Sequence, residues 1–478
     1  MPKTFYITTP IFYPNASLHM GHAYTTTLVD ALARYHRQQG AATYFLTGSD
    51  ENTEKVVRAA KEAGVPTREF LDSIVDNFKQ LFGALDISYD QFIRTSDEEI
   101  HWPGAQELWR KLEAAGDIYK ASYEGLYCVG CEAFLTEKDL IDGKCPTHGT
   151  VPERLKEENY FFRLSKYTNQ IKSAIESGKL RVIPETRKKE ILSLLDQGLE
   201  DISFSRPKEK VFLGIPVPGD DNQVMYVWCD ALSNYITALG YGRPDTELFN
   251  TFWPANYHVI GKDILRFHAA LWPAMLLSAG IEMPQAILVH GMITSGGKKM
   301  SKSLGNVINP LELVEAYGSE AVRYYLLRHV SPFEDGDLTV ESFKEIYNAN
   351  LANGLGNLVA RVLTMSSRHL PEGVSFEDGV SEALQSEVAL HMSKLEINQA
   401  LDLIWKKVSQ LDTFIQQTEP FKTIKTNPEQ AKDDIRKLIL GLSEVAELLL
   451  PFLPETATRI REAIKVNAAP PILFPRKD

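Results

Sequence analysis

An alternating pattern of strands and helices, interrupted at Gly116 and resumed after residue 220, restricts the folds open to this chain. Residues 5–8 and 43–47 have the composition of buried strands, and residues 21–36 between them carry helical spacing. After the interruption, residues 257–261 and 286–291 again resemble buried strands. Strands that alternate with helices build parallel sheets. We therefore predict an α/β fold whose Rossmann-type parallel sheet, formed by residues 1–116 and 224–295, is interrupted by an insertion at residues 117–223.

Local signals refine this prediction at several element boundaries. Pro10 and Pro14 predict that residues 10–15 form a loop after the first strand. Helical spacing predicts helices at residues 66–83 and 97–115. From residue 347 to 465 the pattern is helical throughout, and residues 472–474 are the first plausible strand beyond it. We expect residues 347–478 to form a helical bundle.

The sequence His19-Met20-Gly21-His22 stands where the first strand gives way to a helix. Two imidazoles three residues apart share one helix face, and a glycine between them allows a ligand to approach the backbone. The N-terminus of a helix favours phosphate groups. These features together predict a triphosphate-binding site.

A carboxylate, Asp50, follows the predicted strand at residues 43–47. At the carboxyl end of a parallel strand it would point into the ligand crevice of the sheet. It could equally cap a helix that starts near Asn52. Both interpretations remain open from the local sequence.

Three of the four cysteines and one histidine form the pattern C-x2-C-x13-C-x2-H, at Cys128, Cys131, Cys145 and His148. Two close pairs of thiolate and imidazole ligands can complete a tetrahedron around Zn²⁺. Four protein ligands leave no position for water, so the pattern favours a structural rather than a catalytic zinc. Buried unpaired cysteines are the alternative.

A glycine-flanked loop at residues 295–306 contains Lys298, Lys299 and Lys302. Lysine is a mobile point charge that can follow phosphate oxygens during a reaction. A solvated surface loop is the alternative interpretation. We assign residues 296–346 to this loop and to a stem-contact region that follows it.

Composition excludes several classes of protein. The chain of 478 residues has 51 Lys and Arg against 63 Asp and Glu, a net charge of −12, which argues against indiscriminate nucleic-acid binding but allows one local basic surface. No run of about 18 apolar residues could span a membrane, and the N-terminus lacks the apolar region of a signal peptide. We expect a cytoplasmic protein with no membrane partner.

Several motifs in combination resemble the methionyl-tRNA synthetase family of class I aminoacyl-tRNA synthetases. The two signatures of the class are His19-Met20-Gly21-His22 and Lys299-Met300-Ser301-Lys302-Ser303. Within the class, the resemblance to this family rests on the single zinc pattern and on three further motifs: Pro10-Ile11-Phe12-Tyr13, Tyr226-Val227-Trp228-Cys229-Asp230-Ala231-Leu232 and Gly261-Lys262-Asp263-Ile264. The resemblance covers essentially the whole chain.

The resemblance implies a ligase that activates L-methionine with ATP and transfers it to the 3′ end of initiator and elongator tRNA(Met). It implies that His19, His22, Lys299 and Lys302 are catalytic, that Mg²⁺ accompanies ATP, and that one structural Zn²⁺ is bound. The implied ATP-binding residues are His19, Gly21, His22, Asp263, Lys299, Ser301 and Lys302. The implied methionine-binding residues are Ile11, Tyr13, Asp50, Trp228, Ala231, Leu232, Tyr235, Ile264 and His268, with Asp50 holding the α-ammonium group.

The resemblance also implies that the bundle reads the CAU anticodon through Asn357 and Arg361, which are four residues apart on one helix face. Relatives carry a Pro-Trp pair for stacking on the first anticodon base, and the corresponding residues here are Pro420 and Phe421. Phe421 can stack but lacks the indole N–H. Cys229 is a second departure, since relatives usually carry a larger apolar residue there. We expect it to pack behind the pocket.

Two alternative functions are weighed against this one. A cysteine-type class I synthetase also combines the two signatures with zinc, but its zinc binds the substrate thiol and needs an open position. A non-catalytic tRNA-binding paralogue is disfavoured by the intact His19, His22, Lys299 and Lys302. Because no length remains after Asp478 for the module that dimerises some relatives, we expect a monomer.

Overall fold

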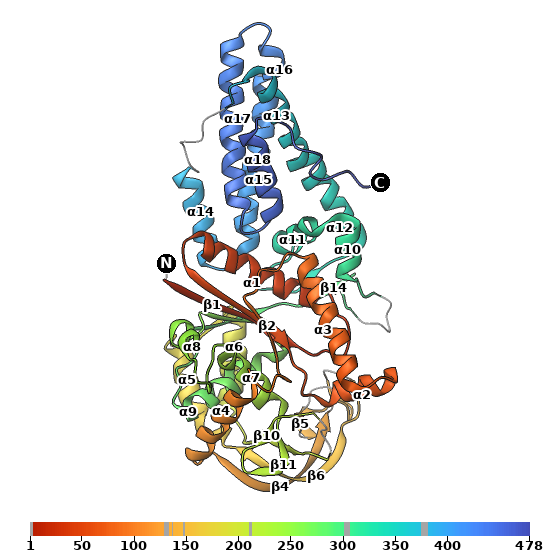
Figure 1. Cartoon of the computed structure of the whole chain (residues 1–478), viewed down its shortest axis with the longest axis vertical. Helices are drawn as coiled ribbons and strands as arrows, with labels where there is room; N and C mark the ends of the chain where they lie inside the picture. Colours follow the sequence, from red (N-terminus) through yellow and green to blue (C-terminus); the bar gives the residue numbers. More distant parts are fainter. Residues whose placement is uncertain are drawn as a thin grey trace. The chain divides into compact units, whose positions relative to one another are not determined.

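A computed structural model describes residues 3–128, 133–135, 137–146, 149–209, 213–300, 306–373 and 381–478. The chain divides into two compact units (Figure 1). The sheet unit comprises Met1–Leu18, Ala41–Gln80 and Ser88–His290, and the bundle unit comprises His19–Gly40, Leu81–Ile87 and Gly291–Asp478. Among the described residues, no helix has the length and apolar character needed to cross a membrane.

A six-stranded sheet of order β3-β2-β1-β12-β13-β7 forms the core of the sheet unit, and every neighbouring pair is parallel. The prediction of a Rossmann-type parallel sheet is confirmed. All five residues of β13 are buried, as expected for a strand covered on both faces. The strands are β1 (Thr4–Phe12), β2 (Ala42–Ser49), β3 (Gln91–Arg94), β7 (Arg181–Ile183), β12 (Tyr257–Gly261) and β13 (Ala286–His290).

The predicted loop at residues 10–15 was wrong at its start, because β1 continues through Pro10 to Phe12. The pairing of β1 with β2 shifts register between Thr8 and Ile11. A proline cannot donate to a sheet, and such an irregularity is one of the places where a strand accommodates it.

Strand β7 lies within residues 117–223, which were assigned to the insertion, yet it pairs with β13 at the edge of the parallel sheet. The insertion therefore contributes to the core it interrupts, and its exact boundaries remain a prediction. Its other strands form two antiparallel sheets. One contains β4 (Ile118–Cys128), β5 (Ala133–Leu135), β6 (Glu153–Phe162) and β8 (Ile202–Ser203), and the other contains β9 (Ser205–Pro207), β10 (Pro216–Val217) and β11 (Asp220–Met225).

Helices accompany the strands of the sheet unit. The helix predicted at 66–83 is α3 (Thr67–Ala84), but the one predicted at 97–115 is α4 (Trp102–Ala114) and begins later, with Pro103 in its first turn. Where the α/β pattern resumes, residues 224–225 end the strand β11 and residues 227–237 form a helix. The others are α2 (Glu54–Ala63), α5 (Thr168–Glu176), α6 (Glu185–Asp196), α7 (Val227–Thr237), α8 (Glu247–Phe252), α9 (Trp272–Ala279), the short η1 (Glu137–Asp139), η2 (Leu164–Tyr167) and η3 (Lys262–Ile264), and the π-helical η4 (Phe267–Leu271).

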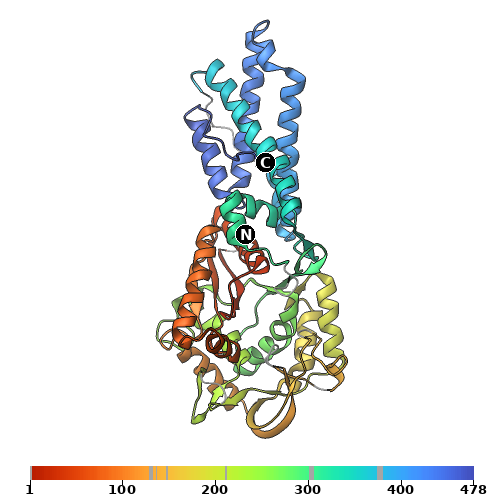
Figure 2. The ribbon, with the colours of Figure 1, turned by 90° about the vertical axis from the view of Figure 1, so that its right-hand side faces the viewer.

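Most of the described residues between 347 and 465 are helical, as predicted for the bundle unit, and α13, α15, α17 and α18 run side by side (Figures 1 and 2). Residues 472–474 form no strand, so that expectation was wrong. Leu473 and Phe474 are buried instead, and the ring of Phe474 packs against Tyr347. The helices are α1 (Met20–Gln38), α10 (Pro310–Tyr317), α11 (Ser319–Arg328), α12 (Val340–Ile346), the π-helical η6 (Tyr347–Gly356), α13 (Asn357–His369), α14 (Glu382–Ser393), α15 (Ile397–Thr418), α16 (Pro420–Thr423), α17 (Pro428–Leu449) and α18 (Pro454–Lys465).

A close approach at Gly104 fixes how α4 packs on α7. A Cβ added at Gly104 would lie 2.3 Å from the Tyr241 carbonyl oxygen and 2.5 Å from the Thr237 methyl group. We expect Gly104→Ala to destabilise the protein by about 1–3 kcal/mol through overpacking, measured as a lower Tm. Gly83→Ala in α3 is the control, since its Cβ would meet no described heavy atom within 4 Å. A Gly104→Ala variant as stable as the control would contradict the prediction.

Candidate active site

The carboxyl ends of β1, β2 and β12 bring predicted site residues to one edge of the sheet unit. Tyr13 follows β1, Asp50 follows β2, and Asp263 and Ile264 lie in η3 directly after β12. The chain order reverses between β1 and β12, because β2 and β3 lie on one side and β13 on the other. In parallel sheets this reversal is where ligands bind.

Asp50 is buried, with 2% of its surface exposed, and does not cap the following helix. The cap of α2 is Thr53, whose hydroxyl accepts a hydrogen bond from the Val56 amide at 3.3 Å. The capping interpretation of Asp50 is therefore wrong, and the ligand interpretation remains.

Buried polar contacts hold both residues that follow Asp50. The Glu51 carboxylate accepts hydrogen bonds from Ser49 Oγ at 2.5 Å, from Arg94 Nε at 2.7 Å and from Ser96 Oγ. Asn52 Nδ2 donates to Asp230 Oδ2 at 2.8 Å and to the Thr95 carbonyl at 2.9 Å. These contacts give the loop that carries Asp50 a defined conformation.

Asp230 links this loop to α7, the helix that carries the predicted residues Trp228, Ala231, Leu232 and Tyr235. Its second oxygen, Oδ1, lies 2.7 Å from His101 Nε2, and His101 Nδ1 lies 2.7 Å from Thr237 Oγ1. His101 and Asp230 are fully buried. Sequence reasoning missed both as site residues: Asp230 stood inside a quoted motif, whereas no signal marked His101.

Tyr235 and His268 are joined by a hydrogen bond of 2.7 Å between the phenol oxygen and Nε2. His268 Nδ1 lies 3.0 Å from the Ile264 carbonyl oxygen, which can only accept, so Nδ1 carries the proton and Nε2 accepts from the tyrosine. Burial lowers the pKa of His268 to about 4, so its ring is neutral near pH 7. Burial, together with the nearby charge of Asp50, raises the pKa of Tyr235.

Trp228 completes an aromatic group with these two residues. Its ring stacks on Phe267 at 3.8 Å between centroids and meets the edge of His268 at 6.3 Å. Its indole N–H is buried and has no hydrogen-bond acceptor among the described residues. Phe267 was missed by sequence reasoning, although it directly precedes His268 in the π-helix η4, a conformation common at functional sites.

The remaining predicted pocket residues lie on the same core. Ala231 and Leu232 are buried on α7, and Ile11 and Tyr13 pack against the hydrophobic cluster that includes Trp228 and Tyr235. Cys229 is also buried, and burial raises the pKa of its thiol well above the ordinary value. It is therefore an apolar packing residue rather than a reactive group.

In the bundle unit, His19 and His22 form a reciprocal cap at the start of α1. His19 Nδ1 accepts from the Gly21 amide at 3.0 Å, and His22 Nδ1 accepts from the His19 amide at 3.1 Å. Both rings therefore carry their proton on Nε2. The rings stack at 3.9 Å.

Gly21 gives room to the ring of the first histidine. A Cβ at this position would lie 2.9 Å from His19 Cε1, which is closer than real Cβ contacts. The glycine therefore allows the His19 ring to fold over the first turn of α1, in addition to any role in ligand approach.

The lysine loop begins as a β-hairpin in the bundle unit. Strands β14 (Ile293–Ser295) and β15 (Lys298–Lys299) pair around Gly296 and Gly297, both with positive φ, as a tight hairpin turn demands. Asp337 in β16 (Gly336–Asp337) accepts from the Gly297 amide at 2.9 Å and from Thr294 Oγ1 at 2.8 Å. The predicted Ser301 and Lys302 lie outside the described residues.

Only half of the predicted zinc site lies within the described residues. Cys128 ends β4 and pairs with Ala133 on the antiparallel strand β5. The carbonyl of Cys145 accepts a hydrogen bond from the Gly149 amide at 2.7 Å. Both cysteines are buried, whereas Cys131 and His148 lie outside the described residues. The described part of the chain contains no group of three or more potential metal ligands.

The predicted anticodon residues lie on α13 and α16. Asn357 is the first residue of α13, directly after the π-helix η6. Arg361 forms an ion pair of 2.7 Å with Asp412 on α15, and 35% of its side chain is exposed. Phe421 is 45% exposed, and Lys422 Nζ lies 5.8 Å from the centroid of its ring.

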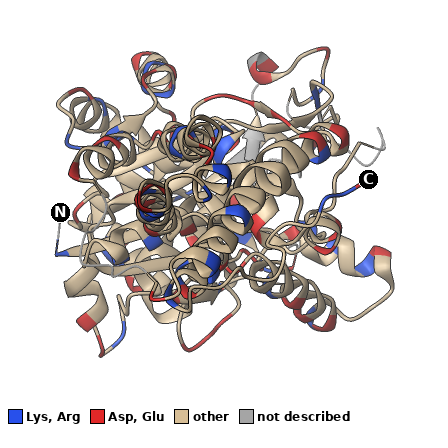
Figure 3. Cartoon of the chain, turned by 90° about the horizontal axis from the view of Figure 1, so that it is seen from above, with Lys and Arg blue, Asp and Glu red and all other residues tan. Residues whose placement is uncertain are grey.

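Acidic and basic residues are interspersed along the helices (Figure 3), and many pair within one helix, as do Lys432 with Glu429 and Arg436 with Asp433 on α17. Such pairs are weak and largely cancel in charge at a distance.

Comparison with protein families identifies the class of protein that this fold and these residues define. Residues 5–150 and 137–363 match the family described as tRNA synthetases class I (M), and residues 372–472 match the anticodon binding domain of methionyl tRNA ligase. The chain thus has the two parts of a class I aminoacyl-tRNA synthetase.

Individual relatives agree with this class. The methionine–tRNA ligase of Clostridium tetani is 44% identical over 97% of this chain and 74% of its own length, and that of Thermotoga maritima is 40% identical over 98% and 76%. The structure of Mycobacterium tuberculosis methionyl-tRNA synthetase in complex with methionyl-adenylate has a TM-score of 0.90 at 38% identity, covering 100% of this chain and 99% of that one. The chain belongs to the methionyl-tRNA synthetase family.

The low pKa of His268 makes the stability of the sheet unit against unfolding depend on pH. Between pH 6.5 and about 4 the unfolded chain binds a proton that the buried ring excludes. The resulting stability is fully present above about pH 6.5 and is lost as the pH falls, by roughly 3 kcal/mol in total. His258, whose pKa burial also lowers, adds to the loss. We expect the urea midpoint to fall from pH 6.5 to 5, and His268→Gln to flatten this slope. An equally steep slope in the variant would contradict the prediction.

Proposed function

We propose that this chain activates L-methionine with ATP, releasing pyrophosphate, and transfers methionine from the adenylate to the 3′ end of tRNA(Met). The observation that carries this proposal is the full-length likeness, at 38% identity, to a methionyl-tRNA synthetase whose structure holds methionyl-adenylate. The matches also favour a methionine enzyme over the cysteine-type alternative.

The sheet unit would bind methionine. Asp50 accepts a charge-assisted hydrogen bond from the α-ammonium group. Trp228, Tyr235 and His268 offer ring surfaces to the thioether, for which sulfur–aromatic contacts are favourable. The neutral His268 adds no charge that would have to be desolvated beside an apolar side chain. Ile11, Tyr13, Ala231, Leu232 and Ile264 complete the lining.

The first step needs no protein nucleophile. A carboxylate oxygen of methionine attacks the α-phosphorus, and the bond to the bridging oxygen breaks, so that pyrophosphate leaves with the electron pair. The residues contribute position and charge. His19 and His22 donate from Nε2–H to phosphate oxygens, and Lys299 and Lys302 neutralise the charge that develops. Gly21, Asp263 and Ser301 complete the ATP site, and Mg²⁺ enters with the triphosphate.

In the second step a hydroxyl of the terminal ribose of tRNA attacks the methionyl carbonyl carbon, and AMP leaves. We propose that the bundle selects this tRNA through Asn357, Arg361 and Phe421. The ion pair with Asp412 holds the Arg361 guanidinium in a fixed orientation, which lowers the entropic cost of a base contact. The chain is expected to act as a monomer in the cytoplasm.

A structural Zn²⁺ held by Cys128, Cys131, Cys145 and His148 is part of the proposal. The two described ligands support it because both thiols are buried, Cys128 at the end of β4 and Cys145 next to a backbone hydrogen bond to Gly149. Bound zinc would tie these two segments of the insertion together.

Pyrophosphate exchange with a panel of amino acids tests the proposal. Methionine alone should support exchange. Exchange with cysteine would point to the other synthetase type, and no exchange with any amino acid would indicate a non-catalytic tRNA-binding protein.

Lys302→Ala tests the lysine loop. We expect the rate of methionine-dependent exchange to fall by about 100-fold or more, because a charge placed for the transition state is lost. Methionine affinity, measured by tryptophan fluorescence without ATP, should change little. Lys298→Ala, a neighbouring lysine of the hairpin, is the matched control. Unchanged exchange in Lys302→Ala would remove the loop from the mechanism.

Phe421→Ala tests the anticodon contact. Stacking of a base on an aromatic ring contributes about 1–3 kcal/mol, so aminoacylation efficiency should fall by roughly 10-fold or more. Pyrophosphate exchange does not involve tRNA and should be unaltered. Leu390→Ala, another exposed apolar residue of the bundle unit, is the control. Undiminished aminoacylation by Phe421→Ala would exclude Phe421 from anticodon stacking.

A further inference from the structure

A fully buried arginine of α11 joins three separate segments of the bundle unit. Arg323 Nε donates to the Phe452 carbonyl at 2.9 Å, and Nη1 donates to the Leu85 carbonyl at 3.1 Å. Its Nη2 forms an ion pair of 2.7 Å with Asp30 of α1, which is also fully buried. The guanidinium therefore fixes α1 against the link between α17 and α18 and against the turn after α3.

Asp30 is held from a second side by its own helix. The oxygen that meets Arg323, Oδ2, also accepts from Arg34 Nε at 2.7 Å, and Arg34 Nη2 donates to the Asp86 carbonyl at 2.5 Å. Arg34 is partly exposed, whereas Arg323 and Asp30 are not. Removing one partner of a buried ion pair leaves an uncompensated charge, so loss of the Arg323–Asp30 contact should cost more than loss of the Arg34–Asp30 contact.

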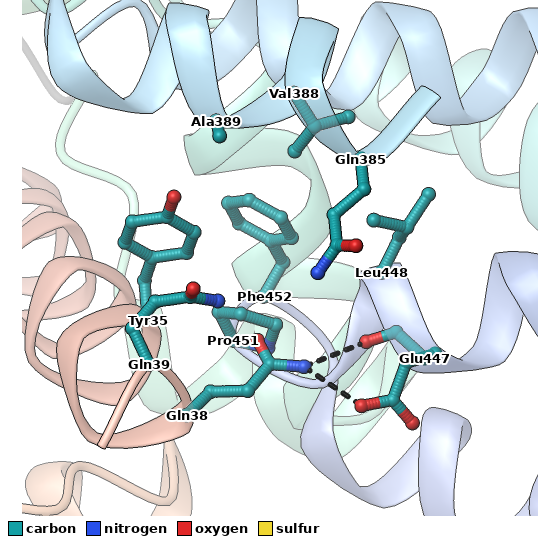
Figure 4. A pocket seen from close by; sticks show the side chains of 10 residues that line it. All are labelled: Tyr35, Gln38, Gln39, Gln385, Val388, Ala389, Glu447, Leu448, Pro451 and Phe452. Carbon is teal, nitrogen blue, oxygen red and sulfur yellow. Dashed lines mark hydrogen bonds between the residues drawn. The ribbon is translucent and has the colours of Figure 1, made fainter. Parts of the chain in front are cut away.

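Apolar packing does not fill the space beside the C-terminal end of α1. A cavity of about 170 Å³ lies between α1, α14 and the end of α17, and is lined by residues that include Tyr35, Gln38 and Phe452 (Figure 4). At its edge Gln38 Nε2 donates to the carbonyl and the carboxylate of Glu447, at 3.1 Å each. These hydrogen bonds add polar contacts to the attachment of the C-terminal end of α1.

The same helix begins with the proposed ATP-binding histidines. Asp30 lies eight residues after His22, which corresponds to about 12 Å along the helix. A tilt of α1 by about 10° around Asp30 would move His22 by roughly 2 Å, whereas catalytic groups must lie within about 0.5 Å of their productive positions. A small tilt of α1 at Asp30 thus displaces the two imidazoles by more than catalysis tolerates.

We propose that Arg323 and Asp30 are positioning residues of the ATP site. They contact no substrate and act by fixing the direction of α1, and with it His19 and His22, relative to the rest of the bundle unit. This inference rests on the proposed function, because it takes the two histidines as ATP ligands.

The test is Arg323→Lys, assayed by pyrophosphate exchange after active-site titration. Lysine keeps the charge but loses the planar fork that reaches Asp30, Leu85 and Phe452 together. We expect the KM for ATP to rise about tenfold or more, as for loss of a bidentate charged contact, with methionine affinity unchanged. Asp30→Asn should give the same shift, and the double variant should be no worse than the singles.

A purely structural role would lower the Tm and the fraction of active sites but leave the KM for ATP per active site unchanged. Asp434→Asn is the matched control: Asp434 is a buried carboxylate on α17 that accepts from Gln430 Nε2 at 3.0 Å. Its KM for ATP should not change. Should Arg323→Lys fail to fold, Arg34→Gln, at the more exposed side of Asp30, should raise the KM for ATP in the same direction.

Two failures are distinguishable. An unsubstituted chain without methionine-dependent exchange would refute the proposed function. An active unsubstituted chain, with an unchanged KM for ATP in Arg323→Lys and Asp30→Asn, or in Arg34→Gln where those variants do not fold, would overturn the positioning role.

Discussion

The parallel pairing of β1 with both β2 and β12 determines where the sheet unit can bind a ligand. Parallel strands place their carboxyl ends at one edge, and in such sheets ligands bind where the chain order reverses, here at β1. Asp50 and Asp263 follow two of these strands, and their positions are consequences of the topology. The aromatic residues come from α7 and η4, so the apolar and the charged parts of the site have different structural origins.

Burial of polar groups is the second constraint, because a buried donor or acceptor without a partner is costly. Around Asp50 it is met by a chain of contacts from Glu51 and Asn52 to Asp230 and His101. The bundle unit meets it in the same way at Arg323. Both networks join segments that are distant in sequence. The first lies next to Asp50, and the second holds α1, the helix that begins with His19 and His22.

The sequence predicted the parallel sheet, α3 and the helical bundle because these depend on local periodicity and strand spacing. It could not predict that β7 joins the sheet or that β1 continues through Pro10, since both depend on pairing with distant strands. Motifs placed Tyr235, His268 and Trp228 in one group, which the structure brings together. His101 and Arg323 carried no local signal, because their importance arises from partners more than 100 residues away.

The cap of α1 explains why the two histidines of the motif His19-Met20-Gly21-His22 are three residues apart. Each histidine uses Nδ1 to satisfy an amide of the first turn, and that bond also assigns the proton to Nε2. Ser or Asn could cap the helix equally well, but neither presents a donor on the far side of a ring. Folding and proposed ATP binding therefore use opposite edges of the same imidazoles. Their spacing of three follows from the geometry of the cap, and Gly21 follows from the space that the His19 ring occupies.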